Sequence, residues 1–271
     1  MLYGLKVRCL KHPRINLLWR KWMVWRGHHV GDYAHLTRHI SDWVGAGDSF
    51  VDIGCMWGVN GRYTFLAEEA GATRCIGVDV FGPTPEFEEE KQQRGSVAEF
   101  ILGDATHPDV IAAVGEVDVV FCAGVLYHHP SPFDLLTALR RMCGRTLILR
   151  TSTIPELRGV ENAAVYFPML GERSRELWNL RSLGLPHQVG ISGPFDPEQG
   201  YGNWFWGLSP TCLVALLSNA GFEVVHRFTE PFAQTVICRA AQVPLEHRLP
   251  GESEARQLGE TISRTGRARP A

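Results

Sequence analysis

Asp52, Gly54 and Gly58 are spaced as a ligand-binding turn requires. They lie between an apolar run at residues 49–53 and a helical run at residues 62–70. A parallel strand that leads through a glycine turn into a helix is how a doubly wound α/β sheet forms a nucleotide site. Glycine lets the backbone approach a ligand closely, and the first turn of a helix offers unpaired N–H groups.

The form of this turn indicates which ligand it accepts. A dinucleotide fingerprint, G-x-G-x-x-G, needs its first two glycines two places apart, but Met56 stands where the second would be. The Gly-Lys-Ser/Thr ending of a phosphate-binding loop does not follow. Asp52 instead places a carboxylate at the strand end, which suits a cationic group better than a polyphosphate. The turn therefore favours S-adenosylmethionine, with its ammonium group, and disfavours a dehydrogenase.

These residues resemble the first motif of the class I S-adenosylmethionine-dependent methyltransferases, D/E-x-G-x-G-x-G, with Met56 in place of the middle glycine. Segments at 75–79, 99–105 and 118–129 follow in the order of that family, so the resemblance covers about residues 50–154. Residues 124–132 are also similar to a motif of the tRNA wobble-uridine methyltransferase subgroup. Enzymes of bacterial secondary metabolism and related actinobacterial small-molecule methyltransferases carry close variants.

The resemblance implies a set of residues that bind S-adenosylmethionine: Asp52, Gly54, Cys55, Met56, Gly58, Asp79, Asp104, Ala105 and Gly124. Asp79 would accept hydrogen bonds from the ribose hydroxyls, and Asp104 would contact the adenine amino group. Each acid also has a structural alternative: Asp52 as a turn former, Asp79 as a helix cap, and Asp104 in an Asx-turn. Met56 and Trp57 either wall the pocket or are buried turn residues.

Two adjacent histidines follow the fourth expected strand, at the edge where open α/β sheets bind ligands. Methyl transfer from a sulfonium depends mainly on the alignment of donor and acceptor. When the acceptor is a hydroxyl, a general base accelerates the reaction further, and histidine titrates near neutral pH. His128 or His129 is therefore the candidate catalytic base. Alternatively, His129 caps the helix that begins near Ser131, or both histidines only line the pocket.

Strand-like and helix-like runs alternate over residues 50–150, which predicts a parallel sheet with helices on both faces. Two further strand-like runs lie at 222–229 and 234–240. The resemblance implies that they close a doubly wound, Rossmann-like α/β sheet of seven mostly parallel strands with an antiparallel hairpin. We expect a methyltransferase domain over residues 45–243. The polar residues 244–271 are rich in structure breakers and are expected to form a disordered tail.

An aromatic-rich segment at residues 154–207 interrupts the alternation. A connection of this length usually has a function or carries helices of its own, so we expect an inserted cap with a helix near 172–180 and a loop at 200–207. Aromatic faces with an amide between them suit a flat or sugar-like acceptor, although plain packing would also use these rings. The candidate acceptor-binding residues are Tyr127, Tyr201, Asn203, Trp204 and Trp206.

A basic helical arm precedes the first strand. Residues 1–44 carry eight Lys or Arg against two acidic residues, whereas residues 45–150 carry eight against fifteen. Four apolar residues of the arm recur at helical spacing: Ile15, Leu18, Trp22 and Trp25. We expect this stripe to pack against the domain, over the cofactor pocket. The alternative is an interfacial membrane helix, in which tryptophans lie beside basic residues.

The cysteines and the hydropathy pattern indicate the compartment. Seven cysteines are dispersed without a C-x-x-C pair, so we expect reduced thiols. The histidines show no metal-ligand spacing, and no metal is expected. Because no apolar run has the length of a membrane span and no signal-peptide pattern is present, we expect a cytoplasmic protein.

Together these features predict a methyltransferase that modifies oxygen on a small molecule, glycoside or glycolipid precursor. A tRNA-modifying methyltransferase is the first alternative, favoured by residues 124–132. RNA binding is helped by a broad basic surface, and only the arm offers one. The second alternative is a non-catalytic scaffold that binds the cofactor and assembles with other proteins.

Overall fold

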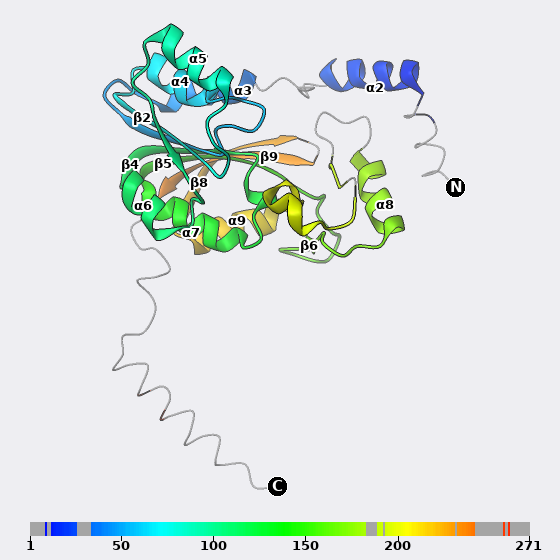
Figure 1. Cartoon of the computed structure of the whole chain (residues 1–271). Coiled ribbons are helices and arrows are strands. Elements are labelled where there is room, and N and C mark those ends of the chain that lie inside the picture. The colour runs from blue at the N-terminus through cyan, green and yellow to red at the C-terminus, as the bar shows by residue number, and fades with distance from the viewer. Residues whose placement is uncertain are drawn as a thin grey trace.

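The structure, a computed structural model, describes residues 9, 12–25, 34–182, 189–191, 193–230, 232–241, 257 and 260. In this part of the chain seven strands form the main sheet: β1 (Ser49–Ile53), β2 (Arg74–Asp79), β3 (Glu99–Leu102), β4 (Val117–Ala123), β5 (Cys143–Ser152), β8 (Phe222–Glu230) and β9 (Ala233–Ala240). They lie in the order β3-β2-β1-β4-β5-β9-β8 (Figure 1). Strands β1 to β5 are parallel, while β9 is antiparallel to β5 and β8. The predicted seven-stranded, mostly parallel sheet with a closing antiparallel hairpin is confirmed.

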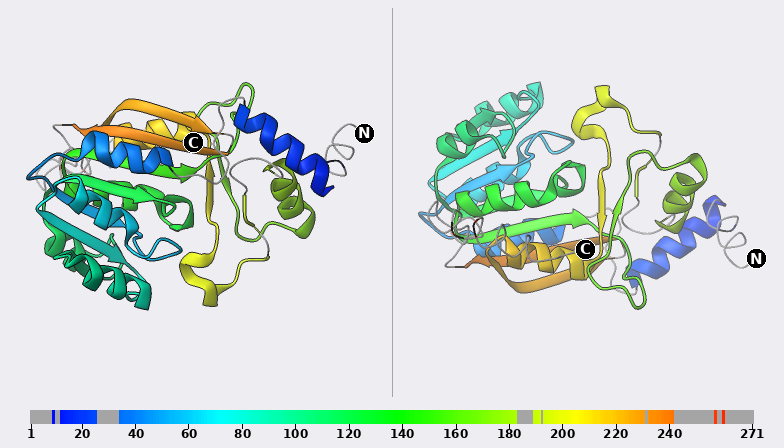
Figure 2. Two further views of the ribbon diagram at one scale, coloured as in Figure 1. Left: turned by 90° about the horizontal axis from the view of Figure 1, so that it is seen from above. Right: turned by 90° about the horizontal axis from the view of Figure 1, so that it is seen from below.

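Helices cover both faces of this sheet (Figures 1 and 2). One face carries α3 (Ala34–Trp43), α4 (Arg62–Glu69) and α5 (Pro85–Arg94). The other face carries α6 (Pro108–Val114), α7 (Pro132–Met142) and α9 (Pro210–Asn219). Each layer encloses its own apolar cluster, with Phe65 and Phe87 in the first and Leu136 and Leu213 in the second.

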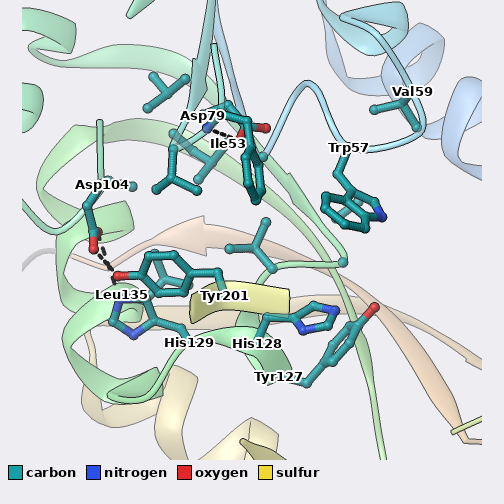
Figure 3. Close-up of a pocket in the computed structure, with 18 of the residues that line it drawn as sticks. Ile53, Trp57, Val59, Asp79, Asp104, Tyr127, His128, His129, Leu135 and Tyr201 are labelled. Carbon is teal, nitrogen blue, oxygen red and sulfur yellow. Dashed lines mark hydrogen bonds and ion pairs between the residues drawn. The ribbon is translucent and has the colours of Figure 1, made fainter. Parts of the chain in front are cut away.

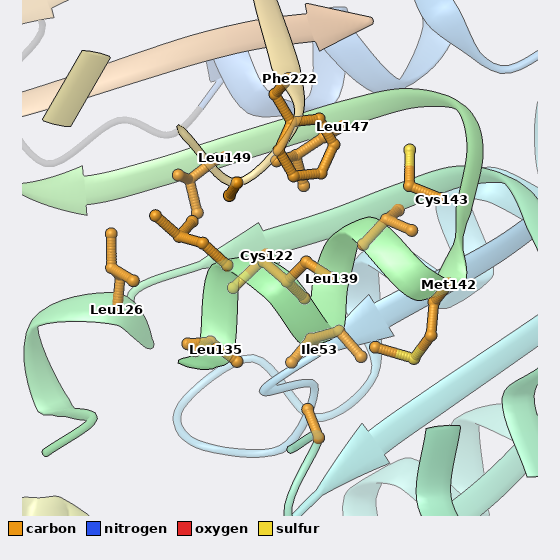
Figure 4. Close-up of a cluster of buried hydrophobic side chains, with 14 of the residues drawn as sticks. Ile53, Cys122, Leu126, Leu135, Leu139, Met142, Cys143, Leu147, Leu149 and Phe222 are labelled. Carbon is orange, nitrogen blue, oxygen red and sulfur yellow. The ribbon is translucent and has the colours of Figure 1, made fainter. Parts of the chain in front are cut away.

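Alternate residues of each strand supply the two cores. In β1, Val51 and Ile53 pack into the cluster beneath α7 and α9, while Phe50 packs beneath α3 and α4. Figure 4 shows the cluster beneath α7 and α9, in which Leu139 of α7 lies with Leu147 of β5. Because strand side chains alternate between the two faces, Asp52 shares the face of Phe50.

Several helices begin where the sequence carries a capping signal. Thr84 accepts a hydrogen bond from the Phe87 N–H at 3.1 Å at the start of α5, and Ser209 accepts one from the Cys212 N–H at 3.3 Å at the start of α9. A proline follows each capping residue, where its missing N–H costs nothing.

The segment between β5 and α9 folds over the carboxyl edge of the sheet. It contains β6 (Ala164–Tyr166), α8 (Glu172–Ser182), the 3-10 turn η2 (Pro197–Gly202) and β7 (Trp206–Leu208). The expectation that residues 200–207 form a loop is wrong at its end, because β7 pairs antiparallel with β6. The Trp206 and Tyr166 rings lie 4.9 Å apart across this pair. Two strands of three residues each are too short to show an alternating pattern in the sequence.

The arm helix α2 (Pro13–Trp25) forms as its periodicity predicts, but the expected orientation of its apolar stripe is wrong. Leu18 and Trp25 are 66% and 79% exposed, and none of the α2 side chains that the structure describes lines the cavity at the sheet edge. Instead Trp19 packs against a cap cluster that includes Phe167 and Ile191. Helical spacing identifies the stripe but does not say which face of the helix has a partner. The predicted tail lies outside the described residues, apart from Gln257 and Glu260.

Candidate active site

The carboxyl ends of β1 to β5 open onto one cavity of about 570 Å³, which the cap covers (Figure 3). Trp57 and Asp79 lie on one side of it, and His128 and His129 lie on the opposite side. Eleven of the predicted site residues line this cavity: Gly54, Gly58, Asp79, Asp104, Ala105, Gly124, Tyr127, His128, His129, Tyr201 and Trp204. Five others do not line it: Asp52, Cys55, Met56, Asn203 and Trp206.

The turn after β1 requires glycine at position 54. Gly54 has a φ of 83°, in the left-handed region, and a Cβ there would lie 2.3 Å from Val125 Cγ2. This turn therefore packs directly against the loop after β4, where Gly124 also has a positive φ of 84°. The two glycine turns bring bare backbone to the wall of the cavity.

Asp79 connects the end of β2 to the β1 turn. Its Oδ2 accepts a hydrogen bond from the Met56 N–H at 2.7 Å, and its Oδ1 accepts one from the Phe81 N–H at 2.9 Å. Each carboxylate oxygen retains a further lone pair for a ligand hydroxyl. Met56 contributes its backbone N–H to this arrangement, while its side chain is buried.

Asp52 lies beneath the cavity rather than in its wall. Its side chain is 1% exposed and accepts a hydrogen bond from Thr64 Oγ1 at 3.3 Å. Burial, and then repulsion from Asp79, raises the pKa of Asp52 to about 8. The carboxyl group is therefore largely protonated at neutral pH. Its direct contact with a ligand stays a prediction.

Asp104 joins three parts of the structure at the adenine end that the sequence predicts. Its Oδ1 accepts hydrogen bonds from Thr106 N at 2.8 Å and Thr106 Oγ1 at 2.7 Å, which is the Asx-turn considered as its alternative role. Tyr201 of the cap donates its hydroxyl to Oδ2, and His129 Nε2 lies 3.8 Å from Oδ1. These neighbours, His129 foremost, hold the pKa of Asp104 well below its usual range. An ionised acceptor thus lines the cavity.

The contacts of Tyr201 with His129 and Asp104 affect the protonation of its hydroxyl. The ring of Tyr201 stacks on His129 with centroids 5.6 Å apart and an interplanar angle of 22°. Burial, followed by the hydrogen bond to Asp104, raises the pKa of the Tyr201 hydroxyl. Tyr201 therefore stays a neutral donor across the physiological pH range.

His128 lies in the short 3-10 turn η1 (Leu126–His128) that follows β4. Its Nδ1 is 2.7 Å from the carbonyl oxygen of Asn203. Because a carbonyl only accepts, Nδ1 carries the proton and Nε2 keeps its lone pair. Burial lowers the pKa of His128, so the neutral form dominates near pH 7. The rings of Tyr127 and Trp204 lie beside it, with centroids 4.2 and 5.6 Å away.

His129 has a more structural environment than His128. Its Nδ1 lies 2.8 Å from the Ser131 carbonyl oxygen and 3.1 Å from the Ser131 nitrogen, just before α7. The N-cap residue of α7 is Ser131, and no side chain forms a cap hydrogen bond there, so the capping alternative for His129 is not confirmed. Its Nε2 side faces Asp104. Both nitrogens thus lie against groups of the protein.

Asn203 and Trp206 support the cap instead of lining the cavity. Asn203 Nδ2 donates to the carbonyl oxygens of Asp196 and Gly200 at 2.7 and 2.9 Å, which closes the η2 turn. The carbonyl oxygen of the same Asn203 accepts a hydrogen bond from His128 Nδ1–H. Trp206 Nε1 donates to the Pro130 carbonyl at 2.8 Å. Neither residue lines the cavity, so their contact with an acceptor stays a prediction.

Sequence reasoning missed several residues of the wall. Trp57, left undecided between wall and buried turn, is 74% exposed at the cavity mouth, with its ring 5.4 Å from that of Phe81. Phe81 follows Asp79 by two places, so its position after a ligand-binding strand was the available signal. Arg150 interrupts the apolar run of β5 at the carboxyl edge, and a charge within a buried strand was the signal there.

Among the described residues, no helix has the length and hydropathy needed to span a bilayer. No group of three or more His, Cys, Asp or Glu side chains in this part of the chain is placed to hold a metal ion.

Known proteins resemble this chain over the segment that forms the parallel strands. A family model described as a methyltransferase domain matches residues 51–146, the segment from β1 to β5. A curated relative, the tRNA U34 carboxymethyltransferase of Colwellia psychrerythraea, is 32% identical over 165 residues. That match covers 58% of this chain, and the chain spans about half, 46%, of the relative's length.

Solved structures share the fold. The N-terminal domain of EvdMO1 with SAH bound matches 78% of this chain and 81% of its own with a TM-score of 0.53 and 19% identity. The 1,6-didemethyltoxoflavin-N1-methyltransferase of Burkholderia thailandensis, crystallised with 1,6-didemethyltoxoflavin and S-adenosylhomocysteine, matches 76% of this chain and 78% of its own. Its TM-score is 0.50 and its identity is 17%.

Proposed function

We propose that residues 51–146, which match a methyltransferase domain, bind S-adenosylmethionine, and that the protein transfers a methyl group to a hydroxyl oxygen of a small molecule, glycoside or glycolipid precursor. The observation that carries the choice of oxygen is the bond from His128 Nδ1 to the Asn203 carbonyl. That bond leaves a basic nitrogen, Nε2, on a residue that lines the cavity.

The residues of the cavity fit S-adenosylmethionine. Its volume of about 570 Å³ lies in the range of cofactor and small-molecule sites. Gly54 admits a ligand against the backbone, and Asp79 offers two oxygens for ribose hydroxyls. Asp104 stands one strand further along the edge, where it would accept a hydrogen bond from the adenine amino group. When bound, S-adenosylmethionine supplies an electrophilic methyl group.

The chain's own residues then have two tasks. The first is to hold an acceptor hydroxyl near His128, beside the rings of Tyr127 and Trp204, which contact each other with centroids 4.4 Å apart. The second is to take the hydroxyl proton onto Nε2 of His128 as the oxygen gains its methyl group. The Asn203 carbonyl stabilises the imidazolium that results, because it accepts the hydrogen bond from Nδ1–H both before and after the proton transfer. The cap excludes water from this step through the Tyr201 contact with Asp104.

One experiment tests this function. The purified protein is incubated with methyl-labelled S-adenosylmethionine and a cell extract separated into small molecules, lipids and RNA. The proposal expects label in the small-molecule or lipid fraction, in a product that resists the mild alkali that cleaves methyl esters. His128→Gln protein serves as the control and should give little label. Binding of S-adenosylhomocysteine without turnover on any fraction would favour a scaffold instead.

A tRNA-modifying activity is the second candidate, since the curated relative is named as a tRNA U34 carboxymethyltransferase. It would place the label in the RNA fraction. Binding of tRNA that weakens steeply with salt would support it, because phosphate contacts release counterions. Among the described residues, Arg14 and Lys21 on the exposed surface of α2 offer a basic surface for such contacts.

A further inference from the structure

Arg150 is a buried cation in the cavity wall that the proposed reaction does not use. It lies at the carboxyl end of β5, paired in register with Ala123 of β4. Its side chain is 6% exposed, yet it lines the cavity. Its Nη2 lies 3.3 Å from Glu230 Oε2, on β8. Burial of a guanidinium group is costly, so its presence in the cavity wall requires an explanation.

The groups around this pair belong to the α3 face of the sheet. Glu230 Oε2 is 3.9 Å from His35 Nε2, which in turn lies 3.3 Å from Thr235 Oγ1. His35 and Leu36 are neighbours on α3, and Leu36 lines the cavity together with Tyr63. Arg150 therefore forms the polar corner of an otherwise apolar end of the cavity.

Stability alone does not account for an ion pair here. Removing two charges from water costs more than their attraction returns in many proteins, so an apolar pair of the same size would serve the core equally well. A guanidinium at a ligand cavity has another use, because its planar fork matches a carboxylate with two parallel hydrogen bonds. Glu230 then acts as the counter-charge that keeps Arg150 in place.

We propose that Arg150 binds a carboxylate group within the cavity. The proposal rests on the proposed function, and it names a part of the site for which no role has been assigned. Two molecules of that reaction can supply the carboxylate. One source is the amino-acid end of S-adenosylmethionine, and the other is an acidic group on the acceptor.

The strand order supports a carboxylate at this end. Along the edge lie Asp104 after β3, Asp79 on β2, the glycine turn after β1, and then β4 and β5. Neighbouring strands are about 4.8 Å apart, so β5 lies roughly 14 Å from β2, three strand spacings away. A nucleoside whose ribose is at Asp79 would extend its amino-acid end toward Arg150. An acceptor beside His128 would also reach it, because both residues line the one cavity.

The first test compares two nucleosides by calorimetry: S-adenosylhomocysteine, and 5′-methylthioadenosine, which lacks the amino-acid end. Arg150→Met alone would leave Glu230 as an unpaired buried charge, so the main variant is Arg150→Met with Glu230→Gln, and Glu230→Gln alone is the control. A cofactor carboxylate on Arg150 predicts that the double variant loses about tenfold to a hundredfold in affinity for S-adenosylhomocysteine. Its affinity for methylthioadenosine should stay unchanged, and the control should lose less affinity for S-adenosylhomocysteine than the double variant does.

The second test covers the acceptor. The double variant and the Glu230→Gln control are saturated with methyl-labelled S-adenosylmethionine and a small-molecule extract, and the products are separated on an anion-exchange resin. Unchanged nucleoside affinities with selective loss of label from the retained, acidic products would assign Arg150 to the acceptor. If both nucleosides weaken equally, or neither affinity nor the product distribution changes, Arg150 has no carboxylate ligand. If the wild-type protein binds no S-adenosylhomocysteine, the proposed function itself fails.

Discussion

The hydroxyl of Tyr201 donates a hydrogen bond to Asp104 Oδ2, and so joins the cap to the end of β3 across 97 residues of sequence. The same carboxylate accepts two bonds from Thr106 and faces His129. Asp104 is thus both part of the cavity wall and the anchor of its cover. Opening the cap must break a hydrogen bond to an ionised carboxylate.

Tyr201→Phe should therefore loosen the cap without altering the sheet. We expect S-adenosylhomocysteine to dissociate about fivefold faster, because the bond is partly exposed and worth roughly 1 kcal/mol. Stopped-flow fluorescence measures this rate. Tyr166→Phe, at a cap tyrosine outside the cavity wall, is the matched control. Equal dissociation rates for wild-type and Tyr201→Phe protein would show that the cap does not retain the ligand.

Alanine substitutions at Gly54 and Gly58 distinguish the cost of backbone strain from the cost of a steric clash. Both have positive φ, 83° and 70°, but only a Cβ at Gly54 meets a neighbour, Val125 Cγ2 at 2.3 Å. Gly58→Ala should destabilise the protein by about 1 kcal/mol, as strain alone predicts. Gly54→Ala should cost more and abolish S-adenosylhomocysteine binding. Thermal melts and calorimetry measure the two effects.

The clash at Gly54 has its own control. Val125→Ala removes the methyl groups that an alanine at position 54 would meet. Combined with Gly54→Ala, it should restore the stability to the level of Gly58→Ala. A double variant as unstable as Gly54→Ala would mean that the turn fails for a reason other than contact with Val125.

The pH dependence of turnover should report His128. A general base must be neutral, so the rate falls as the pH drops through its pKa. Because burial lowers the pKa of His128 from 6.5, the acid limb of kcat/KM should lie below pH 6.5. His128→Gln should lose this limb and slow turnover about a hundredfold or more, with unchanged S-adenosylhomocysteine affinity. The same change at His129 should leave the limb in place, since its nitrogens face Ser131 and Asp104.

Asp52 should make the protein less stable at high pH. In the unfolded chain its carboxyl group releases a proton near pH 3.8, whereas in the folded protein it does so near pH 8. Between these values the unfolded state binds fewer protons, so the free energy of unfolding decreases as pH rises from about 4 to about 8. Asp52→Asn removes this term. Its melting temperature relative to wild type should rise from pH 5 to pH 8, and a constant difference would contradict the buried, protonated state.

Much of the candidate site can be predicted from the sequence, because the end of an apolar run marks the carboxyl end of a strand. Asp79, Asp104 and Gly124 each end or follow an apolar run, and parallel strands bring such ends to one edge. Asp52 is the instructive exception. It shares a face with Phe50, two places earlier, and this alternation already indicates that its side chain points into the core beneath the turn.

Other parts depend on partners that no local pattern encodes. The stripe of α2 was visible, but which of its residues meet the cap was not, and Trp19 makes that contact in place of Leu18 and Trp25. The roles of Asn203 and Trp206 depend on carbonyl acceptors in the η2 turn and at Pro130. Backbone acceptors are present at every residue, so sequence alone does not distinguish a supporting amide from one that binds a ligand.

The first and last residues of the cap segment lie side by side. Thr153 forms a parallel bridge with Leu208, and the Ile154 N–H donates to the Leu208 carbonyl at 3.0 Å. A segment whose two ends lie side by side can be exchanged for another of different length while the strands of the main sheet keep their register. Under the proposed function the cap contacts the acceptor, so exchange of residues 154–207 alone should change which molecule is methylated.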